Sequence, residues 1–299
     1  MLFFPTVVRD IFQRHFLRRI DMTGVIDVGG GLRDIYGAGV FDRCIDEKIF
    51  FDYCLGVSAG GANIASYTAG QRGRNYRFFN VYSFHDDYMG VGCLKKTGRF
   101  LNLDYVYSTL SNSTGIDPLD YAVFSEYPGE IKTVATNALT GEPKYFERSD
   151  YKPDNYAPLK ASSCLPIISR PVFIDGIPYY DGGLSDPVPI EKAFADGCDK
   201  VVVILTKPLN AKPSDTRNKA AASLIRRSYP NAAAKLDIMG EKYLASVSLL
   251  QEYEKSGRVL IIAPSDCCGV NTLSRDRTKL DTLYHMGYED AEKIIEFVK

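Results

Sequence analysis

Short apolar runs alternate with segments of helical spacing along most of this chain. The runs at 24–28, 51–57, 200–206 and 258–264 are nearly unbroken, which is typical of strands buried on both faces of a sheet. Segments 35–49, 59–70 and 189–197 have the composition or spacing of helices, and Gly70 and Gly197 mark the ends of two of them. Strand and helix in repeated alternation predict an α/β fold, with a largely parallel sheet covered by helices on both faces.

Other stretches predict hairpins and further helices. Segments 130–147 and 171–183 each read as two strands around a turn, the second turning at Asp175 and Gly176. Residues 214–256 are mostly helical in pattern, and 288–298 predicts a closing helix. Residues 71–130, rich in Tyr, Phe, Asn and Gly, predict helices and long loops that could cover a site. The apolar positions of 7–20 fit one helical face, which would pack on the protein's own core or lie on a membrane surface.

Composition and charge narrow the function classes. We interpret the 299 residues as one domain (1–299), because no internal repeat or linker stands out. A net charge of −1 does not favour nucleic acid. No apolar stretch reaches the roughly 18 residues of a membrane span, and no signal-peptide pattern begins the chain. We therefore expect a cytoplasmic protein. Seven scattered cysteines and three distant histidines show no ligand spacing, so we expect neither metal nor cofactor.

The stretch GVSAG (56–60) places Ser58 between a predicted strand and a predicted helix. This pattern is typical of a sharp turn in which a strained serine points its hydroxyl outward, while Gly56 and Gly60 avoid collisions with neighbouring backbone. The N-terminal amides of the following helix favour negative charge beside that hydroxyl. Ser58 is therefore a candidate nucleophile; the alternative is a small-residue turn where a helix packs closely on the sheet.

A glycine-rich loop, VGGGLRD (28–34), follows the first predicted strand. Phosphate cradling is disfavoured because Asp34 is acidic and no G-K-[ST] follows. An oxyanion hole fits better, since bare amides at Gly30 and Gly31 could face a tetrahedral intermediate and Arg33 could add positive charge. A tight strand-to-helix turn without chemistry is the remaining alternative.

A serine nucleophile also needs a proton acceptor. His15, His85 and His285 lie in no obviously catalytic context, whereas Asp181 ends a predicted strand and is followed by Gly182 and Gly183. Partial desolvation would raise its pKa toward neutrality and make it a better base. The alternative for Asp181 is a cap on the turn after a hairpin.

Together, GGGLRDIYGAGVFD, GVSAG and DGG resemble, in this order, the patatin-like phospholipases, and most closely their bacterial esterases. The resemblance covers about 23–206 and is less diagnostic over 207–299. It implies a three-layer α/β/α sandwich with a central, mostly parallel sheet, a Ser-Asp dyad, and hydrolysis of lipid acyl esters without a metal. Residue by residue it implies the nucleophile Ser58, the base Asp181, the oxyanion loop residues Gly30, Gly31 and Arg33, and the motif glycines Gly29, Gly56, Gly60, Gly182 and Gly183.

One position departs from the family's pattern, and other functions stay open. The family loop usually reads G-G-G-x-R-G, but Asp34 stands at its last position and could pair with Arg33. The partner expected is a lipid or acyl-ester substrate, with peripheral membrane contact conceivable and the oligomeric state open. The alternatives are an α/β-hydrolase triad using His285, a non-catalytic lipid-binding module and, more distantly, a nucleotide-binding protein.

Overall fold

The computed structural model describes residues 21–211 and 215–299. At its centre is a single sheet in the order β5-β6-β3-β2-β1-β7-β8, with β4 paired to β3. The neighbours β3, β2, β1, β7 and β8 are parallel, whereas β4 and β6 run antiparallel to β3. The strands are β1 (Thr23–Asp27), β2 (Tyr53–Val57), β3 (Glu130–Asn137), β4 (Pro143–Glu147), β5 (Val172–Ile174), β6 (Ile177–Asp181), β7 (Lys200–Ile204) and β8 (Val259–Ile262).

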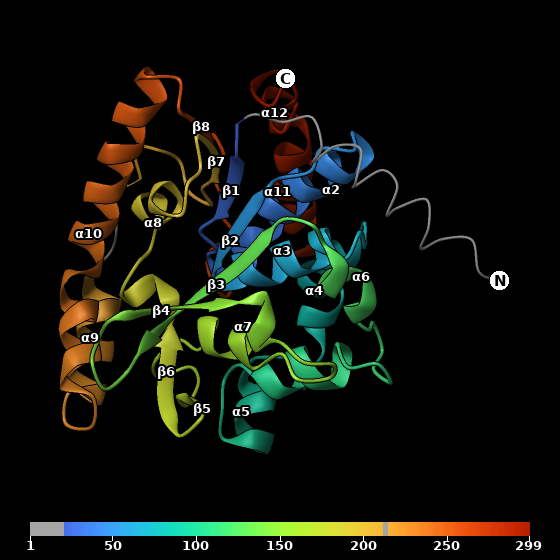
Figure 1. The fold of residues 1–299 in the computed structure, drawn as a ribbon. Helices are drawn as coiled ribbons and strands as arrows, with labels where there is room; N and C mark the ends of the chain where they lie inside the picture. Colours follow the sequence, from blue (N-terminus) through green and yellow to red (C-terminus); the bar gives the residue numbers. More distant parts are fainter. Residues whose placement is uncertain (1–20, 212–214) are drawn as a thin grey trace.

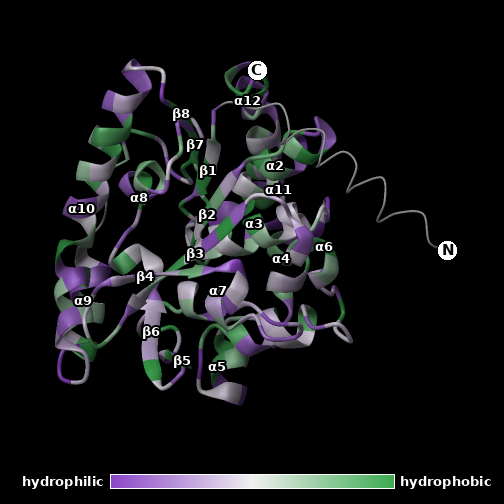
Figure 2. Ribbon diagram, in the orientation of Figure 1, coloured by the Kyte–Doolittle hydropathy of each residue, from purple (hydrophilic) through white to green (hydrophobic). Residues whose placement is uncertain are grey.

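Helices cover both faces of this sheet and complete three layers (Figure 1). One face carries α2 (Ile35–Asp46), α3 (Ala59–Thr68) and α11 (Arg277–Asp290), and the other carries α8 (Ile190–Ala195) and α10 (Pro230–Lys255). Successive residues of β1 serve the two layers, since Val25 belongs to the first core and Ile26 to the second. Figure 2 shows the result, with hydrophobic residues on the central strands and hydrophilic ones on outer helices such as α9 (Asp215–Ile225). The predicted α/β/α sandwich is confirmed.

Several shorter helices lie between β2 and β6 in the chain. The region 71–130 contains α4 (Arg74–Asn80), α5 (Val91–Thr97), a π-helical turn (Tyr105–Leu110) and α6 (Tyr121–Glu126). Helix α7 (Ala157–Ser162) packs against β3, β6 and α3. These elements supply much of the wall around the site described below.

The C-terminal part of the chain differs from the sequence prediction. Instead of one helix over 288–298, α11 begins at Arg277 and α12 spans Glu292–Phe297. Helix α11 lies directly against α2, because a Cβ at Gly287 would be 2.0 Å from the Tyr36 carbonyl oxygen. Most of α11 is polar and only a narrow stripe is buried, so its pattern is weak.

Two sequence predictions concern the segment 7–20 and membrane-spanning helices. The predicted helix over 7–20 lies outside the described residues. Among the helices that are described, none combines the length and apolarity needed to cross a bilayer.

Candidate active site

Ser58 occupies a strained turn between β2 and α3. Its backbone has φ 56° and ψ −127°, a conformation that side-chain-bearing residues rarely adopt and that costs about 1–3 kcal/mol. The flanking glycines are required by contact distances: a Cβ at Gly56 would lie 2.4 Å from the Gly61 Cα, and one at Gly60 would lie 2.3 Å from the Asp27 carbonyl oxygen. The Ser58 amide donates to the Ser162 hydroxyl at 2.8 Å, which holds the turn from α7.

The register of three strands explains how Asp181 reaches this turn. β2 runs parallel to β3 and ends with Val57 opposite Val134. β6 runs antiparallel to β3 and ends with Asp181 opposite Ala135, the next residue along. Both lie on the same edge of β3, since β4 occupies the other edge at these positions. The C-terminal ends of β2 and β6 therefore meet head to head, and residues far apart in sequence become neighbours.

The Asp181 carboxyl is buried and held at one oxygen. Oδ1 accepts a hydrogen bond from the Gly183 amide at 2.8 Å, while Oδ2 accepts none of normal geometry from the described residues. Burial raises the pKa of Asp181 to about 6, and the nearby Ser58 hydroxyl and the Gly183 amide limit that rise. Gly182 allows the close approach, because a Cβ there would lie 2.2 Å from the Val134 carbonyl oxygen.

The glycine loop packs over the start of α3. A Cβ at Gly29 would lie 2.2 Å from the Val57 carbonyl oxygen and 3.1 Å from the Ala59 amide nitrogen. The Gly29 amide donates to Asp27 and the Leu32 amide to the Thr272 carbonyl. Between them, the amides of Gly30 and Gly31 donate to no other described residue. Gly30 (φ 146°) and Gly31 (φ 61°) both have backbone conformations that favour glycine.

Arg33 lies beside this loop and points toward the C-terminal segment. Its Nη1 donates to the Thr272 hydroxyl at 3.1 Å, and its Nη2 would lie 3.3 Å from a Cβ at Gly30. Partial burial lowers the pKa of Arg33 from its usual value, although a guanidinium keeps its charge near neutrality. The Arg33 guanidinium is therefore close to the loop, and it forms no ion pair with the described residues.

Asp34 forms no ion pair with Arg33, although the sequence left such a pair open. Its carboxyl is fully buried beneath the loop, where Asp27 also lies, and a Cβ at Gly37 would touch both. Asp27 accepts from the Gly29 amide and from Asn63, each at 3.0 Å. Burial raises the pKa of Asp34 well above its usual range, and the neighbouring Asp27 raises it further. Since two adjacent buried carboxylates repel, this arrangement favours the protonated form of Asp34.

The described histidines stand apart from Ser58. Nδ1 of His85 lies 2.9 Å from the Tyr105 hydroxyl in an exposed position. His285 lies within α11, not before a helix as the sequence suggested, and its Nε2 is 3.6 Å from Asp281 on the exposed face. Neither shares an interaction with Ser58, and His15 falls outside the described residues. Within the described ranges, no group of three or more His, Cys, Asp or Glu side chains is placed to hold a metal ion.

An apolar pocket with about 500 Å³ of empty space opens above Ser58. It is lined by Ser58, Gly31 and Thr272 together with hydrophobic side chains that include Met89, Leu101, Leu103 and Leu165. The pocket continues inward, because a second cavity shares Ala59, Phe79, Tyr88, Val106 and Tyr107 with it. Aromatic residues of the region 71–130, namely Phe79, Tyr88 and Tyr107, therefore line the space beside the nucleophile candidate.

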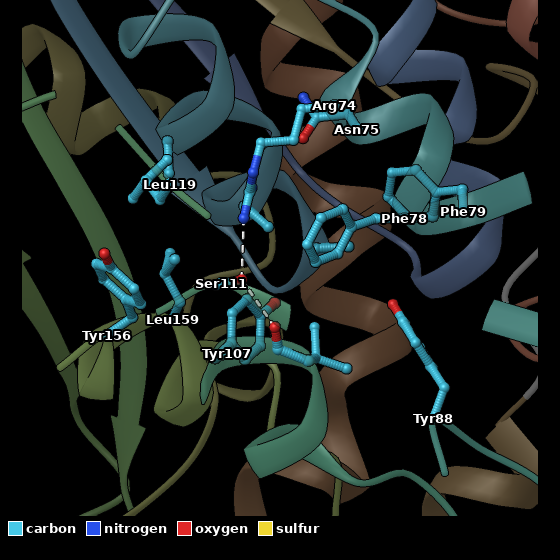
Figure 3. Close-up of a pocket in the computed structure, with 14 residues that line it drawn as sticks. Arg74, Asn75, Phe78, Phe79, Tyr88, Tyr107, Ser111, Leu119, Tyr156 and Leu159 are labelled. Carbon is cyan, nitrogen blue, oxygen red and sulfur yellow. Dashed lines mark hydrogen bonds between the residues drawn. The ribbon is translucent and has the colours of Figure 1, made fainter. Parts of the chain in front are cut away.

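Figure 3 shows the inner cavity. Phe78, Phe79 and Tyr88 line one side, and Leu119, Tyr156 and Leu159 the other. The side chain of Arg74 reaches in from α4 and donates to the Ser111 hydroxyl at 2.9 Å. It also donates to Ser66 and to the Asp117 carbonyl. This fully bonded cation gives the inner end of an otherwise apolar cavity a polar boundary.

Sequence reasoning missed the residues that support the glycine loop and the turn at Ser58. Thr206 donates to the Gly29 carbonyl at 2.5 Å, and Ser162 accepts from the Ser58 amide. Thr272 accepts from the Leu32 amide and from the Arg33 side chain. These contacts bring together segments 104 to 240 residues apart in the chain, and no local pattern marks them. Asp27 alone had a local signal, because it ends a strand just before the glycines.

Two family models match parts of this chain. Residues 28–194 match the family model described as patatin-like phospholipase, and residues 229–299 match a domain of unknown function, DUF6363. Uncharacterized protein YjjU of Escherichia coli (strain K12) is 30% identical over 193 residues, covering 60% of this chain and 50% of that protein. Lysophospholipase NTE1 of Scheffersomyces stipitis is 23% identical over 298 residues, covering 92% of this chain and 18% of that enzyme.

One solved structure shows a more distant likeness. The crystal structure of VipD from Legionella pneumophila aligns with a TM-score of 0.47 and 16% identity, covering 92% of this chain and 67% of that chain. The chain spans half of the YjjU sequence and less than a fifth of NTE1. Activities of those whole proteins are therefore not transferred to it directly.

Proposed function

This chain belongs to the patatin-like phospholipase family, whose general activity is the hydrolysis of lipid acyl esters, and we propose that it is a serine carboxylic ester hydrolase. It would act on lipid acyl esters through a Ser58–Asp181 dyad. The substrate class would be that of a phospholipase A, a lysophospholipase or a carboxylesterase. The observation that carries the proposal is the head-to-head meeting of β2 and β6, which sets the buried Asp181 carboxyl beside the strained Ser58.

In the first step, the Ser58 oxygen attacks the ester carbonyl carbon and its proton passes to Asp181. A carboxyl with a pKa near 6 is far better matched to this transfer at neutral pH than one with its ordinary pKa of about 4. The carbonyl oxygen becomes an oxyanion, and the unengaged amides of Gly30 and Gly31, with Arg33 beside them, can stabilise it.

The second half of the reaction reverses these transfers. Collapse of the tetrahedral intermediate breaks the ester bond, and the leaving alkoxide takes the proton from Asp181. Water then attacks the acyl-serine carbonyl while Asp181 accepts a proton, and collapse of this second intermediate releases the carboxylic acid and returns the proton to Ser58. One carboxyl thus acts alternately as base and acid.

The shape of the pocket favours an acyl chain as the group next to the scissile bond. The walls nearest Ser58 are apolar, and the inner cavity continues the apolar lining away from it. An alkyl chain gains free energy in such surroundings in proportion to the apolar surface that leaves water. A polar or charged acyl group would lose its hydration there.

A fluorophosphonate probe and a substrate panel test the proposal. Wild-type protein should react with the probe and hydrolyse p-nitrophenyl esters, lysophospholipids or diacyl phospholipids. Ser58→Ala should lose the probe reaction and at least about 10³-fold of the hydrolysis rate. Ser248→Ala, at an exposed serine on α10 that bonds only the Leu244 carbonyl of its own helix, serves as the serine control and should keep the probe reaction. A wild-type protein that neither reacts with the probe nor hydrolyses any of these esters would contradict the proposal and favour the non-catalytic alternative.

A further inference from the structure

Four large hydrophobic side chains project into solvent around one side of the molecule. Val91 and Leu94, on one face of α5, are 62% and 45% exposed, and Phe173 on β5 is 62% exposed. Ile167, in the loop that follows α7, is 56% exposed. Exposing such side chains has a cost in water, and their gathering on one surface marks an interaction site.

Hydrogen bonds show that these segments form one surface, which we call the entrance face: α5, residues 99–104, the loop 165–170 and β5. The amides of Phe100 and Leu101 both donate to the Ile168 carbonyl, at 3.2 and 3.4 Å. A bridge between Met89 and Leu101 ties the start of α5 to the same segment. In Figure 1, α5 and β5 lie at the same lower edge of the molecule.

Segments of the entrance face form part of the wall of the Ser58 pocket. Met89, Leu101, Leu103 and Leu165 line that pocket and belong to the segments that carry the exposed hydrophobic residues or adjoin them. A neighbouring hollow with about 800 Å³ of empty space shares Leu101 and Leu103 with the pocket and also contains Phe173. The exposed apolar residues therefore lie on or beside segments that line the pocket and the neighbouring hollow.

Positive charge accompanies the apolar residues. Three cations line the hollow, namely Arg99, Lys160 and Arg170, against a single carboxylate, Asp104. Asp104 pairs with both Arg99 and Lys160, at 2.9 and 2.8 Å. Among the described residues, Arg170 forms no ion pair, and neither does Lys95 on the exposed side of α5. The hollow is thus cationic, although the whole chain has a net charge of −1.

We propose that the entrance face docks on a lipid surface, with Val91, Leu94, Ile167 and Phe173 inserted among the lipids and the cations against anionic headgroups. The inference rests on the proposed function, since it takes a membrane lipid as substrate. Single apolar side chains interspersed with cations fit an interfacial layer, in which hydrocarbon and phosphate lie within a few ångströms of each other. The opening of the pocket would then face the layer from which the substrate is drawn.

Vesicle binding and hydrolysis, measured on matched variants, test this docking. The combined variant Leu94→Ser and Phe173→Ser should bind phosphatidylcholine–phosphatidylglycerol vesicles about tenfold or more weakly than wild type. The control combines Leu244→Ser and Leu224→Ser, on α10 and α9, with side chains of comparable exposure. It should bind as wild type does. Lys95→Glu with Arg170→Glu should weaken binding to vesicles containing phosphatidylglycerol but not to pure phosphatidylcholine.

Hydrolysis of two substrates separates this proposal from the proposed function. The entrance-face variants should hydrolyse soluble p-nitrophenyl butyrate like wild type, while losing hydrolysis of lipids in vesicles. Unchanged vesicle binding in these variants, or equal losses in the control, would overturn the docking and leave the esterase intact. If wild type binds vesicles through this face but cleaves no ester, the docking stands and the proposed function fails. A dimer in light scattering that Phe173→Ser dissociates, without vesicle binding by wild type, would overturn the docking in favour of an interface between copies.

Discussion

Replacing Asp181 by Asn should abolish activity and, above about pH 6, stabilise the protein. Burial raises the Asp181 pKa from 3.8 to about 6, so the folded state holds its carboxylate unfavourably. A difference of roughly two pKa units corresponds to about 3 kcal/mol in favour of the unfolded state at pH values above both pKa values. Asn keeps the shape and an acceptor for the Gly183 amide but carries no charge. If its amide hydrogens stay unpaired, about 1–2 kcal/mol of the gain is lost.

The difference in stability between wild type and Asp181→Asn depends on pH, so the assay is run over a range of pH values. Above about pH 6 wild type bears the full cost of the carboxylate, and the cost disappears as the pH falls through 6 toward 4, where folded and unfolded states are both protonated. Urea unfolding of wild type and Asp181→Asn, at pH values between about 4 and 8, should therefore show a stability gap that opens with rising pH. Ester hydrolysis by the variant should fall at least about 10³-fold at all pH values. A variant less stable than wild type at about pH 8 would show that the charge at Asp181 stabilises the fold, and would refute this reasoning.

Four further predictions follow from the same site. In wild type, kcat/KM for p-nitrophenyl butyrate should fall as the pH drops through about 6, because protonated Asp181 accepts no proton; a flat profile between pH 5 and 8 would contradict the assignment of the base. His285→Ala should retain hydrolysis within about twofold, whereas a loss near 10³-fold would favour a Ser-Asp-His triad. Gly30→Ala should lower kcat about 10²-fold, because the new methyl group would lie 2.3 Å from the Thr206 hydroxyl oxygen and displace the loop; unchanged kcat would remove the loop from the mechanism. Ala62→Leu, which fills the inner cavity, should lower kcat/KM for a palmitoyl ester about tenfold more than for a butyryl ester, and equal losses would place the acyl chain elsewhere.

The sequence pattern predicted most of the sheet because parallel central strands are buried on both faces. The apolar runs at 200–206 and 258–264 correspond to β7 and β8, and the turn at Asp175 and Gly176 has the expected positive φ angles of 50° and 78°. The sequence pattern did not predict helix α11, because little of the helix surface is buried. The packing of α11 on α2 depends on two glycines, one in each helix, that face the backbone of the opposite helix. The spacing of hydrophobic residues in the sequence does not indicate such contacts.

The candidate site was predictable where chemistry coincides with a local backbone requirement. Ser58, Gly30 and Gly31 each occupy positive-φ positions, which glycine-rich patterns mark in the sequence. The assignment of Asp181 needed the resemblance to a family, because only the register of β2 and β6 on β3 brings it to Ser58. Supporting contacts from Ser162, Thr206 and Thr272 have no sequence signal, since any hydroxyl side chain that the fold delivers could make them.

Asp34, the residue that departs from the family's loop pattern, is accommodated by its protonation rather than by an ion pair. A carboxylate at this position would place a negative charge under amides that the proposed mechanism needs for an oxyanion. Asp34 is buried against Asp27, however, and this arrangement favours its protonated form. The single negative charge that remains lies on Asp27, which accepts hydrogen bonds from the Gly29 amide and Asn63. Arg33, which stays unpaired with Asp34, keeps its charge beside Gly30. The substitution therefore leaves the electrostatics of the loop nearly as a glycine would.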